Sequence, residues 1–148
     1  YHGWLDNVAP GIAGDARWIE GLPGHAANES IVLAWNDLAA VERALELRGA
    51  EVAALITEPV MCNSGCIPPE PGYLEGLRAL CDRHGVVLIF DEVITGFRMG
   101  LGGAQAHFGV TPDLAIFGKA MASGYPIAAV VGRRAVMETI ASGRAVHA

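Results

Sequence analysis

The sequence predicts an α/β fold in which a mixed, mostly parallel sheet is flanked by helices. Short segments that are apolar at every position alternate with longer segments of helical periodicity. Strands that are apolar throughout are typical of a sheet buried on both faces. Three of these predicted strands are followed by a charged side chain, at Glu58, Asp91 and Lys119. Ligands collect beyond the carboxyl ends of such strands, so the sequence also predicts where a site lies.

The first part of the chain is predicted to hold irregular structure, a strand and a helix. Residues 1–30 are rich in Gly, Pro, Asn and Ala and show little periodicity, which indicates irregular structure. The short apolar run at residues 31–35 predicts a strand. Asn36 or Asp37 is expected to cap a helix that runs to about Arg48. The apolar stripe expected on this helix consists of Leu38, Val41, Ala44, Leu45 and Leu47.

Two further strands and a second helix are expected in the middle of the chain. Continuous β-branched and apolar runs predict strands at residues 52–57 and 86–90. The amphipathic segment between them predicts a helix at residues 73–84. Glycine, proline and asparagine are dense at residues 62–71, and glycine is dense at residues 96–109, so both segments are expected to be loops.

The last part of the chain completes the alternating pattern. Strands are expected at residues 114–117 and 127–132, and a final helix at residues 134–142. The chain has no initiator methionine and no capping signal at its start, and it closes just after the last predicted helix. We therefore expect an internal piece of a longer polypeptide.

Length and composition limit the class of protein. The chain has 148 residues, of which 52% are hydrophobic and 18% charged, and this is enough for one domain with a core. The formal net charge is −6, so a nucleic-acid partner has no electrostatic support. No apolar stretch reaches the roughly 18 residues of a membrane span, and nothing resembles a signal peptide. We expect no membrane partner and a cytoplasmic location.

The cysteines do not form a paired motif. Cys62 and Cys66 are four positions apart, and no second Cys or His pair completes a zinc site. His84 follows Cys81 at helical spacing, which leaves a weak metal interpretation open. The pattern favours reduced cysteines in or near a core and no metal.

Asp91 and Lys119 together predict a pyridoxal phosphate site. The cofactor supplies an aldehyde, and a lysine amine whose pKa is lowered by burial is neutral and can attack it. An incoming amine then displaces the lysine, which can move the α proton. A carboxylate within about 3 Å of the pyridine nitrogen keeps that nitrogen protonated, so that the ring can store an electron pair. Tyr1 can stack on one face of the ring and Val93 can press on the other.

Each of these residues also has a structural interpretation. Lys119 alone resembles a solvated loop residue, and Tyr1 a packing residue. Asp91 and Glu92 alone could be a helix cap or a pair of metal ligands, and Glu58 could simply end a strand. Their positions at the ends of neighbouring strands favour the catalytic interpretation.

Two motifs resemble the signature of class III (ornithine/GABA-type) aminotransferases. They are FDEVITGFR at residues 90–98 and FGKA at residues 117–120. Tyr1-His2-Gly3 and Glu58-Pro59-Val60 are similar to the same family. Asn63-Ser64-Gly65 and the TGFR of the first motif most resemble the branch of glutamate-1-semialdehyde 2,1-aminomutase.

The resemblance implies a homodimeric fold-type I enzyme with its active site at the subunit interface. Residues 1–148 would be part of its large, cofactor-binding domain, incomplete at both ends, and the small C-terminal domain would lie outside them. Lys119 would form the internal aldimine, and Asp91 would meet the pyridine nitrogen. Val93 and Tyr1 would pack on opposite faces of the ring. The other cofactor-binding residues implied are Glu58, Asn63 and His2.

The implied activity is transfer of an amino group between an amino acid or amine and a keto acid or aldehyde. The alternative is the intramolecular transfer of glutamate-1-semialdehyde 2,1-aminomutase, because both reactions use the same half-reactions. The sequence does not specify the small-molecule donor and acceptor.

Three other classes of protein fit the sequence less well. Gly100-Leu101-Gly102-Gly103 lacks the glycine order of a dinucleotide-binding turn and is not followed by a clear helix, and Gly118-Lys119 lacks the rest of a phosphate-binding loop. An enzyme that forms a Schiff base without a cofactor would not need Asp91. A non-enzymatic homologue would not need both Asp91 and Lys119.

Overall fold

The computed structural model describes residues 1–3, 5, 8–9 and 29–144. The chain divides into two compact units, residues 1–35 and residues 36–148. In the first unit, residues 31–35 do not form the predicted strand. Their apolar side chains are largely exposed, and the hydrogen-bonded sheet begins only at residue 54. Among the residues that the structure describes, the run therefore lacks the neighbouring strand that it would need. Within the described residues no helix is long and apolar enough to cross a membrane.

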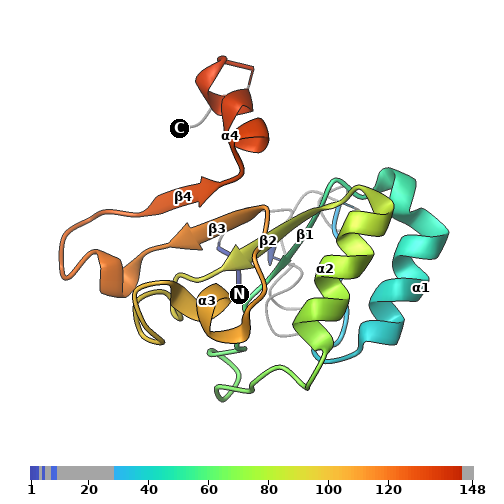
Figure 1. Cartoon of the computed structure of the whole chain (residues 1–148), viewed down its shortest axis with the longest axis horizontal. Helices are drawn as coiled ribbons and strands as arrows, with labels where there is room; N and C mark the ends of the chain where they lie inside the picture. Colours follow the sequence, from blue (N-terminus) through green and yellow to red (C-terminus); the bar gives the residue numbers. More distant parts are fainter. Residues whose placement is uncertain (4, 6–7, 10–28, 145–148) are drawn as a thin grey trace. The chain divides into compact units, whose positions relative to one another are not determined.

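The second unit is built on one four-stranded sheet (Figure 1). Its strands, in both spatial and chain order, are β1 (Ala54–Thr57), β2 (Val87–Asp91), β3 (Leu114–Phe117) and β4 (Ala129–Gly132). The first three strands are parallel to one another, and β4 is antiparallel to β3. This arrangement confirms the predicted mixed, mostly parallel sheet.

Two helices stand on one side of the sheet in Figure 1 and follow the predicted boundaries closely. Helix α1 (Leu38–Arg48) begins at Asp37, whose carboxylate accepts a 2.8 Å hydrogen bond from the N–H of Ala40. Helix α2 (Tyr73–His84) packs against β2 and against α1. The predicted stripe on α1 is wrong at Leu47, which is 83% exposed because it lies two positions after the buried Leu45 and so points to another side of the helix.

The remaining helices are short. Helix α3 (Gly103–Phe108) lies inside the segment predicted to be a glycine-rich loop, so that prediction is wrong there. Its six residues are too few for a visible helical period in the sequence. Helix α4 (Arg134–Ala141) follows β4, as predicted. Single 3₁₀ turns occupy Gly49–Glu51 (η4) and Lys119–Met121 (η5).

Burial along β2 alternates. Leu88 and Phe90 have no exposed surface, whereas Val87 and Ile89 are only half-buried. Successive side chains of a strand point to opposite faces, so one face of β2 is sealed and the other is partly covered. The prediction of a sheet buried on both faces is therefore wrong for one face within the described residues.

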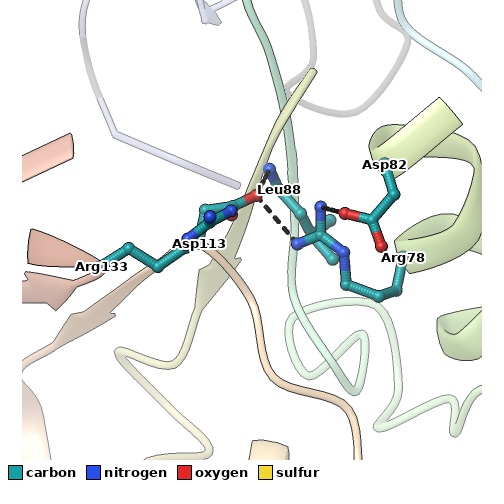
Figure 2. A network of polar contacts seen from close by, with 5 residues as sticks. All are labelled: Arg78, Asp82, Leu88, Asp113 and Arg133. Atoms are coloured by element: carbon teal, nitrogen blue, oxygen red, sulfur yellow. Dashed lines mark hydrogen bonds and ion pairs between the residues drawn. The ribbon is translucent and has the colours of Figure 1, made fainter. Parts of the chain in front are cut away.

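A network of ion pairs and hydrogen bonds around Asp113 connects the amino ends of β2 and β3 (Figure 2). Asp113 is 4% exposed, and its Oδ2 accepts hydrogen bonds of 2.8 Å from Arg78 and from the N–H of Leu88. Its Oδ1 accepts a 2.6 Å bond from Arg133. Arg78 also contacts the exposed Asp82 at 2.7 Å. One carboxylate thus ties α2 and the end of β4 to the start of the sheet.

Candidate active site

The carboxyl edge of the sheet gathers three charged residues. Thr57 pairs with Phe90, so Glu58 and Asp91 follow at the same level. Asp91 in turn pairs with Ile116, three residues before Lys119. All three charged residues therefore end adjacent parallel strands, at the edge where the sequence predicted a site.

Asp91 is the last residue of β2 and is 8% exposed. Its Oδ1 accepts a 3.1 Å hydrogen bond from the N–H of Val93. The backbone of the next residue, Glu92, is still hydrogen-bonded to β3, because its N–H donates to the carbonyl of Ile116 at 2.9 Å. The carboxylate is consequently held on a rigid strand end.

Lys119 begins the 3₁₀ turn after β3, two residues beyond the last paired residue, Phe117. Its φ is +42°, a left-handed backbone conformation that residues other than glycine adopt only at a cost in conformational energy. The side chain is exposed, so the prediction of a buried lysine is wrong for the described chain. The backbone has left the sheet at this point, and the strands no longer flank the residue. Lys119 is the only lysine among the 148 residues.

Val93 lies beside the residue that precedes this lysine. A Cβ placed on Gly118 would lie 3.6 Å from Val93 Cγ1, which is ordinary van der Waals contact. The hydrogen bond to Asp91 fixes the backbone of Val93 at the same time. The structure thus brings Asp91, Val93 and the Gly118–Lys119 segment together.

Glu58 is 7% exposed, and its Oε2 accepts a 3.2 Å hydrogen bond from the N–H of Cys62. This bond folds the segment after β1 back toward its strand. Asn63 follows in an exposed turn. Tyr1 and His2 belong to the first unit, and their part in a site remains a prediction.

Glu92 is a helix cap, one of the two structural interpretations that the sequence left open for this residue. It has no exposed surface, and its carboxylate accepts four hydrogen bonds. The donors are the Thr95 hydroxyl, the N–H groups of Ala104 and Gln105, and the Gln105 side-chain amide. Glu92 therefore caps the amino end of α3 and fixes the loop between Val93 and this helix.

Gly103 leaves room for this carboxylate, and its replacement should be costly. Its φ is +67°, and a Cβ there would lie 2.5 Å from Glu92 Oε2. We expect Gly103→Ala to lower the free energy of unfolding by about 3 kcal/mol, from left-handed strain plus overpacking. Urea denaturation measures the change.

Gly109 provides the matched control for this prediction. Its φ is +70°, but nothing lies within 4 Å of an added Cβ. Gly109→Ala should therefore cost only the backbone strain, about 1 kcal/mol. Equal losses in the two variants would show that the contact with Glu92 is unimportant.

An open groove of about 490 Å³ lies between α3, β3 and β4. Phe97 and Phe117 stand together on its wall, with ring centroids 5.7 Å apart. Other lining side chains include Leu101, Met121 and Val131. Among the described residues no group of three or more His, Cys, Asp or Glu is placed to hold a metal ion.

The fold and the site define an α/β protein with an acid and an amine at the carboxyl edge of a parallel sheet. Comparison with known proteins agrees with this class. The family model described as "Aminotransferase class-III" matches residues 21–148. The chain belongs to the class-III aminotransferase family.

Solved structures extend the similarity to the fold. An omega-transaminase from Sphaerobacter thermophilus is 36% identical with a TM-score of 0.88, over 100% of this chain and 37% of its own. A transaminase with PLP bound is 34% identical with a TM-score of 0.85, over 93% and 33%. A glutamate-1-semialdehyde aminomutase from Pseudomonas aeruginosa PAO1, in complex with PMP, is 34% identical with a TM-score of 0.78, over 99% and 34%. The chain thus spans about a third of each, and the predicted fold type I is confirmed.

Proposed function

We propose that the protein is a pyridoxal phosphate-dependent aminotransferase. It would move an amino group between an amino acid or amine and a keto acid or aldehyde. The observation that carries the proposal is the position of Asp91 and the only lysine of the chain at the ends of adjacent parallel strands. Family membership supports the same activity.

The residues at this edge fit the cofactor. When bound, pyridoxal phosphate supplies an aldehyde for covalent attachment and a ring that accepts an electron pair. Lys119 is exposed and accessible for the attachment, and it would also move the α proton. The buried Asp91 would hold a proton on the ring nitrogen, because a nearby negative charge favours the protonated form.

The remaining site residues would enclose the ring and its surroundings. Val93, already beside Gly118, would pack on one face, and Tyr1 would stack on the other. Glu58, which follows the neighbouring strand β1, would lie close to Asp91 and the cofactor. Asn63 and His2 complete the proposed cofactor-binding set.

We also propose that residues 1–148 lie in the large domain of a homodimer. The alignment of the chain with about a third of each solved structure supports the domain assignment. Exposed apolar side chains at Phe97 and Leu101, on the groove wall, support a subunit interface. Three free cysteines support a reducing compartment, the cytoplasm.

Intramolecular amino transfer is the second candidate. The similarity to a glutamate-1-semialdehyde aminomutase favours it, at 34% identity over 99% of this chain. The two activities separate in one assay. A mutase converts glutamate-1-semialdehyde without an added acceptor, whereas an aminotransferase consumes an acceptor and releases a keto acid or aldehyde.

Borohydride trapping tests the proposed function. After incubation with pyridoxal phosphate, reduction should fix a pyridoxyl group on Lys119. Trypsin does not cleave after a modified lysine, so the adduct should appear on one peptide of residues 99–133. The unmodified protein should instead give two peptides, residues 99–119 and 120–133. Mass spectrometry reads this directly. Lys119→Arg, which keeps the charge, should yield no adduct in this region. A folded protein without the adduct would overturn the proposal.

A further inference from the structure

Cys62 and Cys66 lie at the two ends of one tight turn. Met61 and Ile67 flank this turn and form an antiparallel bridge, with N···O distances of 3.0 and 3.1 Å. The N–H of Cys66 donates to the carbonyl of Cys62 at 3.3 Å. The backbone therefore holds the two cysteines opposite each other.

The separation suits a disulfide. A disulfide spans about 4.4 to 6.8 Å between Cα atoms, and the hydrogen bond from the N–H of Cys66 to the carbonyl of Cys62 closes a five-residue turn that brings the two residues close together. The Cys66 side chain also interacts with the Cys62 thiol. The Sγ of Cys66 already points back across the turn, 3.8 Å from the carbonyl oxygen of Cys62.

The two thiols also differ in access. Cys66 is exposed and Cys62 is half-buried, and both are free. Burial, the charge of Glu58 and the neighbouring Cys66 thiol together raise the pKa of Cys62. External reagents therefore reach Cys66 first, with Cys62 positioned behind it.

We propose that Cys62 and Cys66 form a reversible dithiol–disulfide pair that small-molecule disulfides oxidise. The Cys66 thiolate attacks one sulfur of the disulfide, whose S–S bond breaks and releases a first thiol. Cys62 then loses its proton, attacks Cys66 and releases the second thiol. Both protons and both electrons end on the two released thiols, so the reaction is balanced.

The pair adjoins the candidate site through its backbone. The N–H of Cys62 donates to Glu58 Oε2 at 3.2 Å, and Asn63 lies inside the turn that the disulfide would close. Oxidation would thus restrict the segment after β1. The inference does not rest on the proposed function, because the bond is detected without any assay of activity.

Peptide mapping after oxidation tests the pair. The purified protein is incubated with oxidised glutathione, alkylated and digested with trypsin. One tryptic peptide, residues 49–78, contains Cys62 and Cys66, whereas Cys81 falls in residues 79–83. We expect peptide 49–78 to lose both alkylatable thiols and to be lighter than its dithiol form by two hydrogens. Reduction should restore both thiols.

Variants separate the pair from ordinary surface oxidation. In Cys62→Ser, residue Cys66 should retain glutathione because nothing displaces it. Cys81→Ser should leave the internal disulfide unchanged, since burial raises the pKa of Cys81 to about 11 and the residue lies on α2. Glutathione on both cysteines of the folded wild-type protein, or two unreacted thiols, would overturn the inference.

Discussion

Asp91→Asn should lower the turnover of the proposed aminotransferase by about 10²- to 10³-fold, while borohydride reduction should still fix the cofactor on Lys119. The amide is neutral, so it cannot stabilise a proton on the ring nitrogen as a carboxylate does. Losing a charge-assisted contact in a buried site costs about 3 to 4 kcal/mol, which corresponds to this change in rate. Steady-state kinetics on the loaded enzyme, with a parallel trapping experiment, measures both effects.

The fold should tolerate this substitution. Asparagine keeps an oxygen that can accept the 3.1 Å hydrogen bond from the N–H of Val93. The thermal midpoint should therefore change little, and it serves as the control. Full activity in the variant would favour an enzyme that uses a lysine without the cofactor, because such an enzyme does not need a carboxylate at position 91.

The position of the candidate site could be predicted because it depends on where strands end. An apolar run followed by Glu58, Asp91 or Lys119 is visible in the sequence, and parallel pairing brings such ends to one edge. The cap of α1 was equally local, because Asp37 directly precedes a helical stripe.

The missed features depend on contacts between distant segments. Glu92 was a possible cap, but the helix that it caps, α3, was not predicted, and no local pattern pairs it with Ala104 12 residues later. The exposure of Lys119 follows from a left-handed turn after β3, which its side chain does not favour. Residues 31–35 are apolar like a strand, yet they lack a pairing partner within the described residues.

Asp113 is the clearest case of a residue whose role only the structure reveals. The sequence analysis assigned Asp113 no role beside the strand predicted at residues 114–117, whereas its carboxylate accepts hydrogen bonds from Arg78, Leu88 and Arg133. Burial alone would raise the pKa of Asp113, but the hydrogen bonds from Arg133, Leu88 and Arg78 outweigh it. The pKa therefore lies below its ordinary value.

Asp113→Asn should lower the free energy of unfolding by about 3 kcal/mol at neutral pH. It removes a buried negative charge from two arginines and turns an amide donor toward other donors. Urea denaturation measures the loss. Asp82→Asn is the matched control, because it contacts the same Arg78 but has a side chain that is 62% exposed, and it should cost less than about 1 kcal/mol.

The same substitution should change how stability depends on pH. Because folding lowers the pKa of Asp113, the unfolded chain takes up this proton at a higher pH than the folded protein. The stabilisation is complete above the ordinary pKa of about 4 and disappears as the pH falls through the lower, folded value. The gap between wild type and Asp113→Asn should therefore be constant near neutrality and narrow below about pH 4. A gap that is unchanged throughout acid titration would mean that Asp113 contributes through shape and hydrogen bonds rather than through its charge.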